Sequence, residues 1–166
     1  MISRWQEVTD ALAAEFADIT DVTHLTRIAI RLLMAGILGG FLGLERESQG
    51  KSAGVRTHML VSMGAALFVL VPSLAGAQPD AISRVVQGVV AGIGFLGAGT
   101  ILKNGNLDTH RVRGLTTAAG LWITAGIGVT AGMGKEATAL LSTILALLVL
   151  RVVPWMVSVF LGKNRK

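Results

Sequence analysis

The residues of this chain that could do chemistry gather in two polar stretches, 43–58 and 100–117, which border long apolar runs. Charged side chains so close to an apolar run are costly unless they form pairs or reach the membrane surface. We therefore expect Glu45 to pair with Arg56 or Arg113. The candidate residues of a ligand or partner site are Glu45, Arg46, Lys51, Arg56, Thr57, His58, Thr100, Arg113, Thr116 and Thr117.

A simpler interpretation of these charges also stands. Basic residues at the ends of membrane helices commonly anchor them at the interface without binding anything. We favour this interpretation for Arg46, Lys51 and Arg111. For Glu45, Arg56 and Arg113 we favour a buried network or site, because each abuts an apolar run.

Metal and catalytic motifs are weak. Mg²⁺ requires several oxygen ligands around one or two carboxylates, which Glu45, with Glu47, would have to supply, so Glu45 is the one metal candidate. The chain has no cysteine and three histidines, none of them four residues from another, so no zinc site is expected. Without a serine-nucleophile motif either, we predict no enzyme and no resident cofactor, Mg²⁺ at Glu45 being the open alternative.

The elements that must position these residues are membrane helices. The chain has 166 residues, of which 52% are hydrophobic and 15% charged, a balance typical of a multi-pass membrane protein. Five apolar runs are each near the length that a bilayer requires. We predict an all-α, five-helix membrane domain over residues 25–161, with spans at about 25–43, 57–76, 84–102, 114–132 and 137–161.

The flanking segments are short. Apolar residues at helical spacing in residues 1–24 predict an amphipathic segment that lies on the periplasmic membrane surface or docks on the bundle. Residues 162–166 form a basic tail. Lysines and arginines number three in the first loop, the third loop and the tail, against one in each opposite segment, which predicts an outside N-terminus and a cytoplasmic C-terminus.

Glycine recurs in the run 84–102, which we predict to be the central helix of the bundle. Small residues at such spacing let membrane helices approach closely. The expected packing residues are Gly39, Gly43, Gly88, Gly92, Gly94, Gly97 and Gly99. Residues 92–97 also match the dinucleotide motif G-x-G-x-x-G, but they lie inside an apolar run and no acid follows at the required distance, so we reject that interpretation.

Four motifs occur in a specific order between residues 25 and 150. They are Gly39-xxx-Gly43-Leu44-Glu45-Arg46-Glu47, Lys51-xx-Gly54-Val55-Arg56-Thr57-His58, residues 92–100 (GIGFLGAGT) and residues 112–119 (VRGLTTAA). Together they resemble the signature of the MgtC/SapB family. The resemblance implies a bacterial inner-membrane protein linked to survival in low magnesium and to virulence, and a short member of the SapB type without the soluble C-terminal domain of longer members.

Three functions follow as expectations. The resemblance implies a non-enzymatic protein of magnesium homeostasis that regulates another membrane complex, such as the F-type ATP synthase. The alternative is a channel or carrier for magnesium or another cation, with Glu45 at its cytoplasmic mouth. The third is a homo-oligomer built through the glycine faces. Lipid is an expected partner in each case, and nucleic acid is not.

Overall fold

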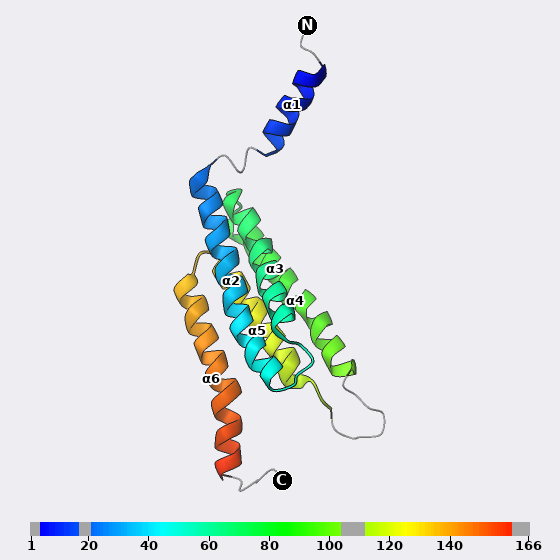
Figure 1. The fold of residues 1–166 in the computed structure, drawn as a ribbon, viewed down its shortest axis with the longest axis vertical. Coiled ribbons are helices and arrows are strands. Elements are labelled where there is room, and N and C mark those ends of the chain that lie inside the picture. Colours follow the sequence, from blue (N-terminus) through cyan, green and yellow to red (C-terminus); the bar gives the residue numbers. More distant parts are fainter. Residues whose placement is uncertain (1–3, 17–20, 104–111, 161–166) are drawn as a thin grey trace. The chain divides into compact units, whose positions relative to one another are not determined.

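The computed structural model describes residues 4–16, 21–103 and 112–160, and within these ranges every regular element is a helix. The helices are α1 (Arg4–Glu15), α2 (Val22–Ser48), α3 (Val55–Leu74), α4 (Pro79–Lys103), α5 (Leu115–Gly132) and α6 (Glu136–Phe160) (Figure 1). By length and composition, α2 to α6 are five helices able to cross a membrane. The predicted all-α, five-span fold is confirmed, whereas the orientation of the termini stays a prediction.

The chain divides into two compact units, Met1–Ile30 and Arg31–Lys166. In the first unit, α1 has no buried residue, and its apolar side chains Trp5, Val8 and Leu12 are exposed. Asp21 precedes α2 and its carboxylate accepts hydrogen bonds from the backbone N–H groups of Thr23 and His24, at 2.8 and 3.3 Å. These bonds stabilise the ionised carboxylate and so lower the pKa of Asp21.

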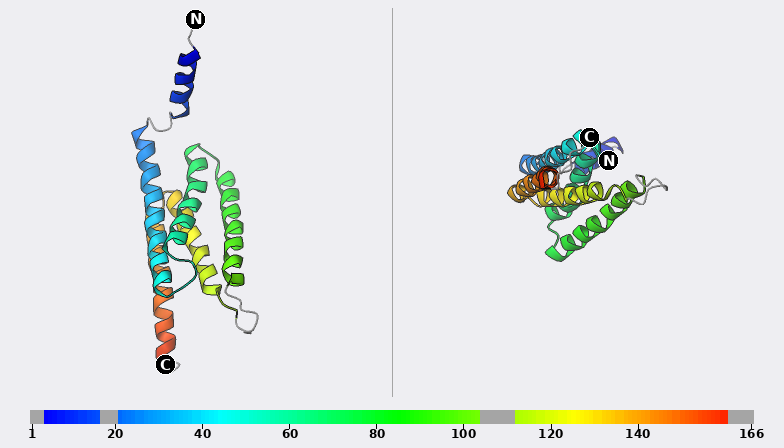
Figure 2. Two further views of the ribbon diagram at one scale, coloured as in Figure 1. Left: turned by 45° about the vertical axis from the view of Figure 1, so that its right-hand side comes forward. Right: turned by 90° about the horizontal axis from the view of Figure 1, so that it is seen from below.

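In the second unit, α5 is the central helix. It packs against α3, α4 and α6, and the view along the bundle shows it between α4 and α6 (Figure 2, right). Its buried residues include Leu121, Ala125 and Ile127, and these belong to two apolar clusters. One cluster joins residues 35–42 of α2 to α3, α5 and α6; the other joins α3, α4 and α5. The prediction that the glycine-rich run 84–102 forms the centre is therefore wrong.

The closest helix contacts are made by glycines of α2 and α5. A Cβ atom at Gly39 would lie 2.6 Å from the carbonyl oxygen of His58, and one at Gly43 would lie 2.5 Å from Cα of Val55. Gly128 and Gly132 of α5 face α3 in the same way. A Cβ at Gly128 would lie 2.8 Å from Cα of Ser62, and one at Gly132 would lie 2.7 Å from Cα of Ala66. Only glycine lets α3 lie so near to its two neighbours.

The glycines of α4 behave differently from the prediction. A Cβ at Gly88, Gly92, Gly94 or Gly99 would meet no atom within 4 Å, and only Gly97 has a near neighbour, Ala118 of α5. Gly88 and Gly92 instead line an apolar groove of about 570 Å³ between α3 and α4. Within the described chain these four glycines therefore do not hold helices together, because α4 meets α5 along a different face.

Arg31 lies in the first half of α2 and contacts the end of α5. Its guanidinium donates a hydrogen bond of 3.1 Å to the carbonyl of Gly132. That carbonyl belongs to the last turn of α5, where backbone oxygens lack helical partners and carry partial negative charge. Arg31 thereby ties α2 to the C-terminal end of α5.

A buried polar cluster as the candidate functional site

The turn between α2 and α3 sets the geometry of the site. Gly50 has a φ of 63°, and the N–H of Lys51 returns to the carbonyl of Arg46 at 3.0 Å, the pattern of a Schellman motif. The carboxylate of Glu47 then accepts a 2.9 Å hydrogen bond from the N–H of Val55 in the first turn of α3. Glu47 therefore caps a helix, which leaves Glu45 without the second carboxylate of a magnesium site.

The end of α2 buries a charged pair. Glu45 and Arg46 are 8% and 3% exposed, and the Nε–H of Arg46 donates to the Glu45 carboxylate. The expected pairing of Glu45 with Arg56 or Arg113 is wrong, and so is the interpretation of Arg46 as a surface anchor. The reason is that α2 continues to Ser48 rather than ending near residue 43, so that both side chains stay within the helix and against the bundle.

His58 lies against this pair and is fully buried. Its Nδ1 is 3.0 Å from the carbonyl oxygen of Gly54, so Nδ1–H donates there and Nε2 is left as an acceptor. A Cβ at Gly120 of α5 would lie 3.7 Å from Nε2 of His58 and 4.0 Å from Cδ of Arg46. Both are ordinary van der Waals distances, so the imidazole and the side chain of Arg46 lie together against α5 at Gly120.

Three buried polar atoms in this region have no hydrogen-bond partner within the described chain: Oε1 of Glu45, Nε2 of His58 and Oγ of Ser62. Buried polar atoms are normally satisfied, so each points to a water molecule or ligand between the helices. We call Glu45, Arg46, His58, Ser62 and Thr117 the buried polar cluster. Its members come from α2, α3 and α5.

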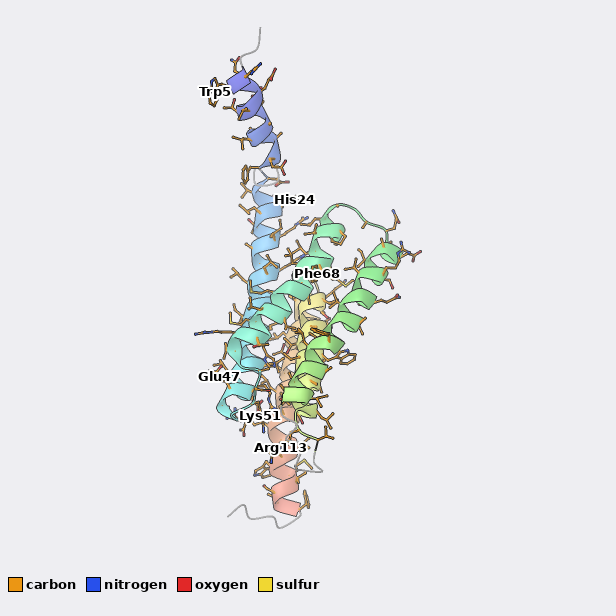
Figure 3. All side chains as sticks on the ribbon, turned by 90° about the vertical axis from the view of Figure 1, so that its right-hand side faces the viewer. Trp5, His24, Glu47, Lys51, Phe68 and Arg113 are labelled. Carbon is orange, nitrogen blue, oxygen red and sulfur yellow. The ribbon has the colours of Figure 1, made fainter. Side chains whose placement is uncertain are left out.

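Thr117, a member of the buried polar cluster, lies one turn before Gly120. The other predicted site residues lie elsewhere, and Thr100 is half-buried and donates its hydroxyl to the carbonyl of Gly97 at 2.8 Å. The remaining five candidates are exposed: Lys51, Arg56, Thr57, Arg113 and Thr116. Lys51 and Arg113 are found, with Glu47, at one end of the bundle (Figure 3), which we call the basic end. Arg111, His110 and the residues 162–166 lie outside the described residues.

Ser62, Gly120 and Thr124 were not among the predicted site residues. A signal for them existed: Ser62 follows His58 by four residues, and Gly120 and Thr124 follow Thr117 by three and seven. Such spacing puts each set on one helix face. The Thr124 hydroxyl, also buried, satisfies itself by donating to the carbonyl of Gly120 at 2.7 Å.

Comparison with known proteins identifies the family of the chain. The model of the MgtC family matches residues 32–159, the greater part of the chain. The chain belongs to the MgtC family. The match runs through α3, α4 and α5 and includes every member of the buried polar cluster.

Three relatives illustrate the range of the family. Protein SrpB of Synechococcus elongatus is 50% identical over 104 residues, which cover 57% of each chain. The protein named "Putative magnesium transporter YhiD" of Escherichia coli K12 is 41% identical over 142 residues, 81% of this chain and 64% of its own. Protein MgtC of Salmonella typhimurium is 47% identical over 118 residues, 71% of this chain and 48% of its own.

The matched region thus spans about half to two thirds of the length of these relatives. No solved structure matches the chain.

Proposed function

We propose that this chain is a non-enzymatic protein of the bacterial inner membrane that acts in magnesium-linked homeostasis by regulating another membrane complex. The observation that carries the proposal is the ion pair between Glu45 and Arg46. A carboxylate that accepts a hydrogen bond from a buried guanidinium has its charge neutralised. A magnesium ion at Glu45 would have to displace that cation or share a site with it, and both are unfavourable.

The exposed residues of the basic end provide a surface for such a partner. Arg56 and Thr57 open α3, and Arg113 and Thr116 lie at the start of α5. The buried polar cluster fixes these two helix ends beside each other, because His58 and Thr117 lie within the first turn of each. Under the predicted orientation this surface faces the cytoplasm, where the F-type ATP synthase also exposes its catalytic part. That complex is our first candidate partner.

Capture from native membranes tests this proposal. Tagged protein is cross-linked in cells grown in low magnesium, purified, and analysed for co-purifying membrane complexes. The variant Arg56→Gln/Arg113→Gln should lose at least tenfold of the partner while its own abundance and helix content are unchanged. The control Arg84→Gln/Lys135→Gln removes two exposed cations from other parts of the chain and should retain the partner. Equal recovery by both variants would contradict the proposal.

A cation carrier is the second candidate, and the unpartnered atoms Oε1 of Glu45, Nε2 of His58 and Oγ of Ser62 favour it. Oxygen and nitrogen acceptors in a buried position are suited to a cation or to a water chain. The name of the relative from Escherichia coli K12, "Putative magnesium transporter YhiD", points to magnesium transport as well. This function requires that Glu45 exchange Arg46 for the ion, so transport would depend on both residues.

A further inference from the structure

A second cavity lies beside the buried polar cluster, at the basic end. Its volume is about 580 Å³, within the range of about 300–1,000 Å³ that is typical of small-molecule sites. Residues of α2, of the turn after it, of the first turn of α5 and of the second half of α6 line it. We call it the basic pocket.

The charged residues of its lining are all cations: Arg46, Lys51 and Arg151. Arg46 is neutralised by Glu45, which leaves the other two as excess positive charge. Neither Lys51 nor Arg151 forms an ion pair within the part of the chain that the structure describes. Two unpaired cations around a cavity without a lining acid favour an anion there.

The start of α5 adds to this field. The helix begins after Gly114, which has a φ of 95° and no side chain that could cap the helix. The first N–H groups of a helix have no partner within it and carry partial positive charge. Thr116 and Thr117 also line the pocket, and hydroxyl donors suit the oxygens of a phosphate.

The opposite wall of the pocket is apolar. It consists of Val149, Leu150, Val153 and Pro154 of α6. Beside them the second half of α6 exposes the apolar side chains of Val152, Trp155, Met156 and Val157, so that this wall continues into a surface suited to acyl chains. A ligand that fills the pocket therefore has an anionic head and an apolar body.

Arg151 joins the two halves of the pocket. The sequence places it within a span, where an isolated arginine is costly, and nine residues before the end of α6. Its neighbours across the cavity, Arg46 and Lys51, mark the end of α2 and the turn after it. An anion held between these side chains would compensate Arg151 at the boundary between hydrocarbon and water.

We propose that the basic pocket binds the phosphate of an anionic phospholipid between Lys51, Arg151 and the start of α5, with the acyl chains along α6. This site is independent of the proposed function, since a regulator and a carrier could both hold a structural lipid.

The experiment uses the whole purified chain, stripped of lipid in detergent and titrated with phosphatidylglycerol or phosphatidylcholine. Bound lipid is counted by native mass spectrometry, and the thermal unfolding midpoint is measured in parallel. Wild-type protein should bind phosphatidylglycerol in preference to phosphatidylcholine and unfold at a higher temperature with it. Inorganic phosphate and glycerol phosphate form the soluble arms. If either raises the midpoint as much as the lipid does, the ligand is a soluble anion and the proposal is overturned.

The variant Lys51→Gln/Arg151→Gln removes both unpaired cations. Each interfacial cation contributes about 1 kcal/mol to the binding of an anionic lipid, and about 1.4 kcal/mol corresponds to a tenfold change in affinity. Loss of both cations should therefore weaken the binding of phosphatidylglycerol roughly 30-fold. Arg84→Gln/Lys135→Gln loses the same charge elsewhere and should bind as wild type does.

The single variant Lys51→Gln is a second test. Lys51 is an exposed turn residue, so its substitution should leave the folding of α6 unchanged. It should weaken binding of phosphatidylglycerol several-fold, and Lys51→Arg should restore it. Equal binding by the pocket variants and the control would overturn the site.

Discussion

Glu45 and Arg46 are neighbours in the sequence, and each is buried against the bundle because the other is there. Removing one partner of a buried pair leaves an uncompensated charge, which commonly destabilises a protein by about 3–5 kcal/mol. His58 packs beside the same pair, so a change at Glu45 also alters the surroundings of the imidazole. The stability of this end of the bundle should therefore depend on the pair as a unit.

We predict that Glu45→Gln lowers the free energy of unfolding by about 3 kcal/mol, because Arg46 stays buried with only a neutral amide beside it. The measurement is equilibrium unfolding in mixed micelles, followed by helix content. Glu47→Gln is the matched control, since Glu47 is exposed and a glutamine oxygen can still cap α3. Glu45→Gln/Arg46→Met, which removes both charges, should recover most of the loss; a double variant as unstable as the single one would argue against a coupled pair.

One residue-level prediction from the sequence was correct in type but wrong in pairing. Glu45 was expected to be buried with an arginine, and it is, but the arginine is the adjacent one. The sequence alone favoured a distant partner because it ended the first span near residue 43, and an ion pair between consecutive residues has no signature in hydrophobic periodicity. Burial of Arg46 depends on α3 and α5, which no local pattern describes.

Among the elements, α5 determines how closely the other helices approach. Gly128 and Gly132 put its backbone against α3, and Gly126, on the same helix, faces open space. Close contact of this kind leaves no room for a methyl group, and overpacking a well-packed contact typically costs about 1–3 kcal/mol. The sequence instead predicted the central position for the longer glycine series of α4.

Gly128→Ala should therefore destabilise the bundle by about 2 kcal/mol or more, because the new methyl group would meet the backbone of Ser62. Gly126→Ala should have no such effect, and it gains slightly from the better helix propensity of alanine. Thermal unfolding of the two purified variants in one detergent compares them directly. Similar melting temperatures would mean that α3 and α5 are farther apart than described.

The hydrogen bond between Arg31 of α2 and Gly132 of α5 contributes less to the free energy of unfolding than the glycine contacts do. Arg31→Gln should lower stability by about 1 kcal/mol, the usual value of one hydrogen bond, because Gly132 loses its donor at the end of α5. Arg27→Gln, one turn earlier on an exposed side chain, serves as the control. The same unfolding assay measures both, and an Arg31 variant as stable as this control would show that the bond does not contribute.

For the whole molecule, the glycine face of α4 is open to its surroundings. Gly88 and Gly92 line a groove between α3 and α4, and no part of the described chain fills it. The membrane-bundle architecture was predictable because five apolar runs and their charges suffice for it. The arrangement of the helices was not predictable, since glycine spacing shows that a helix face lacks side chains but does not show which neighbouring helix packs against it.

Gly92→Leu should leave the folding of one chain unchanged, within about 0.5 kcal/mol, because its side chain would extend into open space. This differs from what a central α4 would require, namely loss of assembly by overpacking. Unfolding in dilute micelles measures the single chain, and cross-linking in native membranes reports whether α4 meets a second copy. A large loss of stability in dilute micelles would restore α4 to a packing role within the chain.

Magnesium flux into liposomes tests most directly whether Glu45 serves a buried ion pair rather than an ion path. The purified chain is reconstituted into liposomes that contain a magnesium indicator. Magnesium flux is then measured with the gradient in each direction and at several membrane potentials. We predict uptake equal to that of empty vesicles, for wild type and for the Glu45→Gln/Arg46→Met variant alike. Saturable uptake by the wild type that this variant abolishes would contradict the account and establish the carrier.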